Sequence, residues 1–210
     1  YVDAEKGVET VEDALQGASD IIAEIISDSA EARKLLKELI DKTGVVRSLA
    51  KKEEDSVYSM YYDYSEAVKK IPSHRILAIN RGENEEFLKV SIEVNEDEAI
   101  KILNNLFITE GSSSTDFCKE SVKDSYTRLI FPSLERETRS NLTEKADEQA
   151  IKMFGSNLKP LLMQPPIKNK TVLAVDPAYR TGCKLAVVDG NSRVLFTGVI
   201  YPTPPQSKIQ

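Results

Sequence analysis

The stretch from residue 171 to residue 201 constrains the fold more than any other part of the chain, because predicted strands, turns and candidate chemistry coincide there. Thr171 to Val175 is a short and almost wholly apolar run, which predicts a strand buried on both faces. Asp176 and Pro177 end this run, since proline removes a backbone donor and restricts the residue before it. The first predicted strand therefore ends at a carboxylate.

Two further strands are predicted after this carboxylate. Lys184 to Asp189 and Val194 to Tyr201 are rich in β-forming residues, and Gly190-Asn191 supplies the chemistry of a tight turn between them. The expected structure of this stretch is a meander of three strands. A buried first strand that ends in Asp, followed by a glycine-containing turn and a hairpin, is the way RNase H-like and actin-like folds begin.

Three motifs carry a resemblance to a known family. DPAYRTGCKLAVVD, from Asp176, resembles the opening of the YqgF, or RuvX-like, domain in the Tex family of bacterial transcription accessory proteins, except that Ala178 replaces a glycine of the usual DPGxRTG. PSHRILAINRGENE, from Pro72 to Glu85, resembles the PSHRxLAxxRGE signature in the middle of Tex proteins. EQAIKMFGSNLKPLLMQPP, from Glu148 to Pro166, resembles the helix that leads into the YqgF domain.

The resemblance covers the whole chain and implies that the chain is a fragment. In the family, an N-terminal helical region precedes this part, and the remainder of YqgF, helix-hairpin-helix modules and an OB-fold RNA-binding domain follow it. The implied fold class is α+β and mostly helical. A Tex-like central helical region with short strands is expected at residues 1–165, and the N-terminal part of a YqgF, RNase H-like domain at residues 168–210. Gln164-Pro165-Pro166 is expected to form a stiff linker between them.

Periodicity and capping residues give the expected elements of the helical region. Helices are predicted over Thr10–Ile26, Asp28–Gly44, Asp63–Ile71, Pro72–Glu83, Asn95–Phe107, Asp116–Phe131 and Ser133–Leu162. Strands are predicted at Val45–Ala50 and at Phe87–Val94, where apolar and polar residues alternate. Pro132 is expected to break or bend the helix that precedes it.

Charge and cysteine content limit the classes of function. The net charge of −6 argues against a broad surface for binding polyanions, so any contact with nucleic acid requires a local basic patch. No apolar run approaches the ~20 residues that span a bilayer, and residues 1–10 do not resemble a signal peptide. We therefore expect a cytoplasmic protein with no membrane contact. Cys118 and Cys183 are expected to be free thiols, without a disulfide or zinc.

Four tyrosines form the densest aromatic cluster, at positions 58, 61, 62 and 64. Such residues can stack on the bases of single-stranded nucleic acid, usually with interleaved basic residues. No Lys or Arg lies between Val57 and Val68, so packing in the core is the favoured interpretation.

The Pro72 motif contains the only histidine, His74. A Ser-His catalytic pair is disfavoured because Ser73 is adjacent, and neighbouring positions on a helix point in different directions. The favoured interpretation is that His74 and Arg75 bond to backbone groups and carboxylates and lock helices together. Ser73, His74, Arg75, Arg81 and Gly82 are therefore regarded as a structural motif.

Asp176 is the one residue with a catalytic precedent. The resemblance implies that it stands at the first-strand position where RNase H-like nucleases hold two Mg²⁺ ions with three or four carboxylates. The other carboxylates would lie beyond Gln210. A single carboxylate cannot assemble this site, so we expect no catalysis, metal or cofactor in this chain, with Asp176 as a vestigial candidate.

Arg180, Thr181 and Lys184, with the amides around Gly182, are candidates for a small anion pocket that contacts phosphate. In the alternative, Arg180 pairs with Asp176 and Thr181 satisfies the amides of the turn. The sequence does not separate these two possibilities.

Three hypotheses about function follow. The favoured one is the scaffold of a Tex-like transcription factor, which reaches nucleic acid mainly through domains outside this chain and has the transcription machinery as a possible partner. The second is part of a metal-dependent, RuvX-like nuclease. The third is a protein-interaction module, which predicts an exposed apolar groove. An unfinished sheet would also leave an edge and an apolar face open, so we expect it to pack on the helical region, to self-associate or to be poorly ordered.

Overall fold

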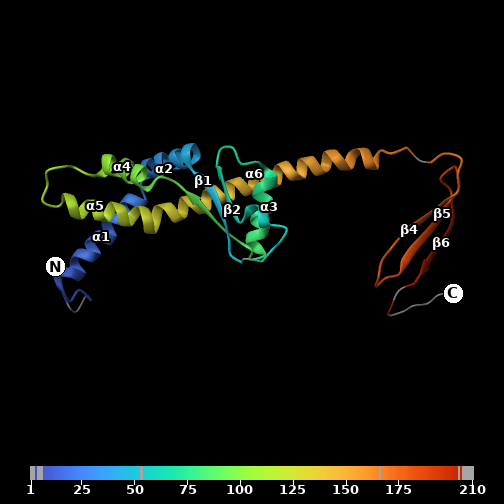
Figure 1. Ribbon diagram of the computed structural model, residues 1–210, viewed down its shortest axis with the longest axis horizontal. Helices are drawn as coiled ribbons and strands as arrows, with labels where there is room; N and C mark the ends of the chain where they lie inside the picture. Colours follow the sequence, from blue (N-terminus) through green and yellow to red (C-terminus); the bar gives the residue numbers. More distant parts are fainter. Residues whose placement is uncertain (1–2, 4–6, 53, 166, 203, 205–210) are drawn as a thin grey trace. The chain divides into compact units, whose positions relative to one another are not determined.

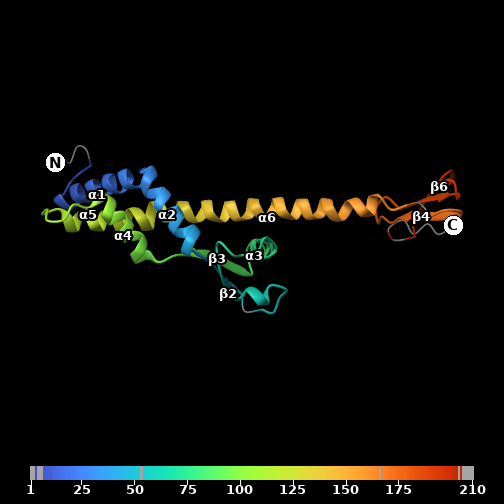
Figure 2. The ribbon, with the colours of Figure 1, turned by 90° about the horizontal axis from the view of Figure 1, so that it is seen from above.

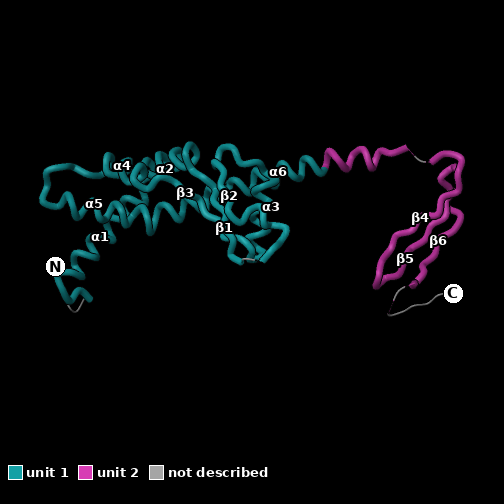
Figure 3. The backbone as a smooth tube through the Cα atoms, in the orientation of Figure 1, with its two compact units in different colours: residues 1–154 teal, residues 155–210 magenta. Residues whose placement is uncertain are grey.

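A computed structural model describes residues 3, 7–52, 54–165, 167–202 and 204 (Figure 1). Contacts within the chain divide it into two compact units, residues 1–154 and residues 155–210 (Figure 3). Each unit is described by itself. Of the expected linker, Pro166 lies outside the described residues. Within the described part, none of the helices has the length and apolar character that crossing a membrane requires.

Unit 1 is mostly helical, as expected. Its helical elements are α1 (Val11–Ser27), α2 (Ala30–Thr43), the short 3₁₀ helix η2 (Ser59–Tyr61), α3 (Ser73–Asn84), α4 (Glu96–Phe107), α5 (Thr115–Asp124), the π-helical segment η3 (Ser125–Ile130) and α6 (Phe131–Leu162), the last of which continues into unit 2. Its strands are β1 (Val45–Ala50), β2 (Asp63–Ala67) and β3 (Leu88–Glu93).

The helix caps decide where α1 and α2 begin. The predicted cap of α1 is confirmed: Thr10 Oγ1 accepts from the Asp13 amide at 3.1 Å, and Asp13 Oδ2 accepts from the Thr10 amide at 3.0 Å. The predicted start of α2 at Asp28 is wrong by one residue. Asp28 ends α1, and Ser29 Oγ accepts from the Ala32 amide at 3.3 Å. A serine hydroxyl one position on therefore takes the capping role.

The three strands of unit 1 form an antiparallel sheet with the order β2-β1-β3. The helix predicted over Asp63–Ile71 is wrong, because residues 63–67 pair with β1 in the register Val45↔Ala67 to Leu49↔Asp63. Asp63, followed by a segment of mixed polar and apolar residues, resembles a capping residue at the start of a helix. A long-range backbone ladder outweighed this local preference for a helix, which is worth about 1 kcal/mol.

The core of unit 1 lies between this sheet and the surrounding helices. Its fully buried side chains include Leu36 on α2, Val46 on β1, Ile79 on α3 and Leu103 on α4. The tyrosine cluster belongs to the same core, as predicted. Tyr58 and Tyr61 are buried, and the half-buried Tyr62 and Tyr64 pack against them.

Pro132 was expected to break or bend the helix, and it does not break it, although the winding changes just before it. Helices α5, η3 and α6 follow one another as a single rod (Figures 1 and 2), and Pro132 lies at the second position of α6. The segment before it is wound as a π helix, in which the Phe131 amide donates to the Tyr126 carbonyl five residues back. Proline lacks an amide proton and crowds the carbonyl four residues before it. The wider winding of η3 accommodates both effects without ending the helix.

Unit 2 contains the predicted meander. Strands β4 (Val172–Asp176), β5 (Cys183–Val188) and β6 (Val194–Ile200) form an antiparallel sheet in that order. Asp189 stabilises the turn between β5 and β6, because its Oδ1 accepts from the amides of Asn191 and Arg193 at 2.9 Å each.

The expectation that the first strand is buried on both faces is wrong for this chain. Leu173 and Val175 of β4 are 61% and 53% exposed. A single sheet cannot bury its own faces, and burial of a strand on two sides needs a layer on each side of the sheet. The apolar run of β4 therefore specifies a strand but does not supply the layers that would cover it.

Candidate functional site

One end of the sheet in unit 2 collects the candidate residues of the sequence motif. Asp176 is the last residue of β4 and lies directly opposite Lys184 near the start of β5. Opposite residues of an antiparallel pair project from the same face, so the carboxylate and the ammonium group share one side of the sheet. Residues 177–182 connect the two strands and form the candidate loop, which carries Arg180 and Thr181.

Gly182 fixes the shape of the candidate loop. Its φ of +78° lies in the left-handed region, and a Cβ at this position would be 2.6 Å from Cε1 of Tyr201 and 2.8 Å from Cγ1 of Val199. Only glycine fits both the backbone conformation and the space. Gly182 is buried against Tyr201, whereas the preceding residues Arg180 and Thr181 are exposed at the surface.

The charged side chains at this end of the sheet are exposed and available to a ligand. In the part of the chain that the structure describes, neither Arg180 nor Asp176 forms an ion pair. The alternative in which Arg180 is occupied by Asp176 is therefore not the arrangement observed. Two cations, Arg180 and Lys184, stand against one carboxylate, which suits a single phosphate rather than an extended polyanion.

Sequence reasoning missed Tyr179. This residue precedes Arg180 and is 84% exposed, more than any other large apolar or aromatic side chain reported for the described residues. An exposed aromatic ring beside an arginine is a typical arrangement for stacking on a base while the phosphate is held. The pairing of an aromatic with a basic residue in a turn was the signal that could have identified it.

The site offers little to a metal ion. No cluster of three or more His, Cys, Asp or Glu side chains that could hold a metal occurs among the described residues. Asp176 has Lys184 as its cross-strand neighbour, and an ammonium group there competes with a cation for the carboxylate. At this end of the sheet the motif residues with ligand chemistry are Asp176 and Cys183, which are fewer than the three side chains of such a cluster.

The second motif lies on α3 in unit 1. Arg75 Nη1 donates to Glu66 Oε2 at 2.8 Å and to the Tyr64 hydroxyl at 3.0 Å, and its guanidinium lies over the Tyr64 ring. The Tyr64 hydroxyl also donates to Glu66. Because residues 63–67 are a strand, Arg75 connects a helix to a sheet rather than two helices.

The other motif residues also have structural surroundings, with one exception. Ser73 Oγ donates to Gln149 Oε1 of α6 at 2.6 Å, and Arg81 Nε donates to Glu85 Oε1 at 2.8 Å. Gly82 is buried where a Cβ would lie 2.6 Å from Cδ1 of Leu88. His74 is exposed, and no hydrogen bond of its side chain occurs within the described part of the chain.

Helices α3 and α6 are joined by further polar contacts. Asn80 Nδ2 donates to Thr143 Oγ1 at 2.8 Å, and Arg139 forms an ion pair with Glu83. An open polar groove of about 290 Å³ follows this seam; it is lined by Asn80, Glu83, Asn84, Arg136, Arg139, Ser140 and Thr143. Arg139 is paired with Glu83, and Arg136 adds a second, exposed cation to the lining. These contacts position α3 against α6.

The Arg75 contacts predict a pH dependence of stability. The hydrogen bond from Tyr64, followed by that from Arg75, lowers the pKa of Glu66 below its ordinary value of 4.5. A carboxyl group with a lowered folded-state pKa stabilises the fold above its unfolded pKa, and this contribution is lost as pH falls through the folded value. Glu66→Gln is therefore expected to be less stable than the parent at pH 7, with the difference shrinking below pH 4.5.

The check is urea unfolding of parent and Glu66→Gln at several pH values. Tyr64→Phe serves as the control, because it removes the largest cause of the shift while leaving the ring in the core. Its pH dependence below 4.5 should be weaker than that of the parent. A gap between parent and Glu66→Gln that stays constant with pH would contradict the assignment.

The two parts define a class of protein: a helical region with a small sheet, followed by the first strands of a YqgF-like domain. A family model for a Tex central region-like part matches residues 1–154, and one for a Tex protein YqgF-like domain matches residues 170–210. The chain belongs to the Tex family.

Individual relatives agree with this assignment. Protein YdcI of Bacillus subtilis is 50% identical over 99% of the chain and 30% of its own length. Transcriptional accessory protein Tex of Neisseria gonorrhoeae is 36% identical over 90% of the chain and 26% of its length. S1 RNA-binding domain-containing protein 1 of Homo sapiens is 34% identical over 93% of the chain and 21% of its own length. The chain thus spans less than a third of the length of these relatives.

Proposed function

We propose that this chain is the central scaffold of a nucleic-acid-binding transcription accessory protein, that it is not itself catalytic, and that it adds one direct contact to nucleic acid. The contact is the exposed loop with Tyr179, Arg180 and Thr181, together with Lys184 near the start of β5. Most of the binding is assigned to parts of the longer protein outside residues 1–210. Components of the transcription machinery are the proposed protein partners.

Family membership supports the transcription and nucleic-acid parts of this proposal. One relative is named a transcriptional accessory protein and another an S1 RNA-binding domain-containing protein. The seams around α3 support the role of scaffold, because the motif side chains of Ser73, Arg75 and Gly82 are used in contacts between elements. The isolated carboxylate of Asp176 supports the absence of catalysis, since a two-metal site needs several carboxylates.

The single observation that carries the direct contact is the open Tyr179-Arg180 pair. An aromatic ring stacks on any base at a gain of about 1–3 kcal/mol, and a guanidinium binds the adjoining phosphate. Both groups are exposed at the same turn, and Gly182 holds that turn in one conformation. Single-stranded nucleic acid, whose bases are free to stack, is therefore the proposed ligand.

Fluorescence anisotropy with labelled single-stranded RNA and duplex DNA tests the contact. We expect the full chain to bind RNA at low salt, Arg180→Ala to weaken binding about 5-fold, and Tyr179→Ala to weaken binding of the single strand about 10-fold. Arg180→Ala should also reduce the slope of log K against log salt by about 1, the amount expected for one lost phosphate contact.

Arg193→Ala is the matched control, because Arg193 is an exposed arginine in the turn between β5 and β6. If Arg193→Ala and Arg180→Ala weaken binding equally, general charge accounts for the effect and the loop is not a specific contact. Incubation of the same RNA with Mg²⁺ should leave it intact, whereas cleavage that Asp176→Asn abolishes would favour the nuclease hypothesis.

A further inference from the structure

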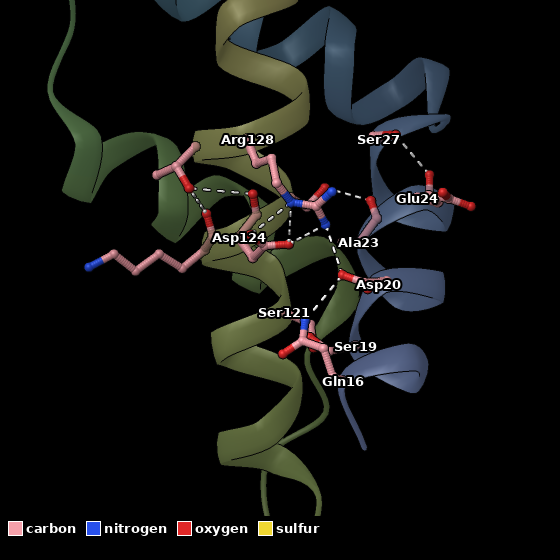
Figure 4. Close-up of polar contacts among 12 residues, drawn as sticks. Gln16, Ser19, Asp20, Ala23, Glu24, Ser27, Ser121, Asp124 and Arg128 are labelled. Atoms are coloured by element: carbon pink, nitrogen blue, oxygen red, sulfur yellow. Dashed lines mark hydrogen bonds and ion pairs between the residues drawn. The ribbon is translucent and has the colours of Figure 1, made fainter. Parts of the chain in front are cut away.

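Helix α1 packs into unit 1 through its polar side (Figure 4). Ser19 and Ser121 share a hydrogen bond of 2.8 Å, Ser125 Oγ donates to the Ala23 carbonyl at 2.7 Å, and Arg128 pairs with Asp20 at 3.0 Å. These partners come from α5 and η3, which lie alongside α1. These groups share the inner side of the helix with Ile26, which is buried in the core, and with the half-buried Ile22.

Four other bulky apolar residues of α1 face outward. Val11, Leu15, Ile21 and Ile25 are 60%, 51%, 60% and 63% exposed. Their spacings of four, six and four residues, at about 100° per residue, spread them over about a third of the helix circumference, which makes one broad apolar stripe. An amphipathic helix in a globular unit normally turns this stripe inward, so its exposure marks the surface as a site of interaction.

The stripe is hollowed into a groove of about 670 Å³. The residues that line it are Val8, Val11, Asp13, Ala14, Leu15, Gly17, Ala18 and Ile21. Three of these are small, and nothing lies within 4 Å of the point where a Cβ of Gly17 would be. Small residues between bulky ones let the backbone of a second helix approach closely, as in helix-in-groove recognition.

The charge of α1 narrows the choice of occupant. The helix contains four acidic residues, Glu12, Asp13, Asp20 and Glu24, and no basic ones. Asp20 is paired with Arg128, whereas Glu12, Asp13 and Glu24 are exposed and Asp13 lines the groove. A second copy of α1 would bring acidic residues against acidic residues, which is unfavourable. An anionic lipid surface is disfavoured for the same reason. A basic partner complements these charges.

We propose that the α1 groove is a docking site for a basic amphipathic helix of another protein. The apolar stripe of that helix lies on Val11, Leu15, Ile21 and Ile25, and its Lys and Arg residues face the carboxylates of α1. This surface is separate from the loop at Arg180, so the proposal stands or falls independently of the nucleic-acid contact.

The test uses the full chain and a synthetic probe. The probe is a fluorescein-labelled helical peptide of about 17 residues, long enough to lie along α1, with Leu on one face and Lys on the other. The control peptide has the same Leu positions with Glu in place of Lys. We expect saturable binding of the Lys peptide, at least 10-fold tighter than that of the Glu peptide and weakened by salt.

A pair of variants places the probe in the groove. Gly17→Leu fills the open space without removing any contact of the fold, and it is expected to weaken binding of the Lys peptide at least 10-fold. Gly155→Leu is the matched control, because Gly155 is also a helical glycine with nothing within 4 Å of its Cβ position. It should leave binding unchanged, and circular dichroism should show that both variants keep their helix content.

Three outcomes would overturn the proposal. Equal binding of the Lys and Glu peptides would remove the argument from charge. Unchanged binding in Gly17→Leu would place the peptide elsewhere. Sedimentation that shows a dimer of the parent chain, and a monomer of Gly17→Leu, would assign the groove to a second copy.

Discussion

Replacing Ile130 by alanine is expected to lower the free energy of unfolding of unit 1 by about 3–4 kcal/mol. Ile130 ends the π-helical segment η3 and is 0% exposed within the core. Removal of its side chain beyond Cβ loses buried apolar contacts and leaves a cavity that a packed core closes only in part. Burial, followed by the charge of Glu96, raises the pKa of Tyr126 on the same segment to about 12.

Urea unfolding followed by circular dichroism measures the effect. Ile151→Ala is the control, because Ile151 lies on α6 and is 72% exposed. Its change in unfolding free energy should stay within about 0.5 kcal/mol. Equal losses in the two variants would show that η3 does not contribute to the core as the structure has it.

Replacing Gly82 by valine is expected to destabilise unit 1 by about 2–3 kcal/mol. A Cβ at this position would meet Leu88 Cδ1 at 2.6 Å, Leu88 Cγ at 3.0 Å and Tyr58 Cδ1 at 3.1 Å. Leu88 and Tyr58 are themselves buried, so neither can move aside without disturbing the sheet or the tyrosine cluster. The gain in helix propensity over glycine, about 0.5 kcal/mol, does not offset this crowding.

Gly17→Ala separates crowding from propensity. Gly17 is also a helical glycine of unit 1, but nothing lies within 4 Å of its Cβ position. Alanine there should raise the unfolding free energy by about 0.5–1 kcal/mol, the opposite sign to Gly82→Val. A stabilised Gly82→Val would mean that α3 and β3 are less closely packed than the structure shows.

The glycines of the two motifs show how far the sequence predicts the site. The Pro72 motif was expected to be structural, and the contacts of Ser73, Arg75 and Gly82 now give physical reasons for that expectation. In the Asp176 motif, the position of the turn was predictable from the strands around it. The exposure of Tyr179 was not, because the burial of an aromatic side chain depends on which other elements pack against it.

The sequence alone determined the elements that are specified by residues only a few positions apart. The cap of α1, the alternation of β3 and the meander of unit 2 were all predictable, because hydrogen-bonding residues and apolar periodicity act over a few positions. The motifs likewise identified the family before any coordinates.

Only the tertiary structure decided those features, such as strand pairing and the buried side of a helix, that depend on residues distant in the chain. Residues 63–67 form a strand because their backbone pairs with that of β1. The inner side of α1 was chosen by Ser121 and Ser125, each 102 residues from its partner. Periodicity shows that a helix has two faces, but the groups that meet each face decide which one is buried. For α1 these groups are hydroxyls, a guanidinium and the core around Ile26, so the stripe of Val11, Leu15, Ile21 and Ile25 was left to solvent.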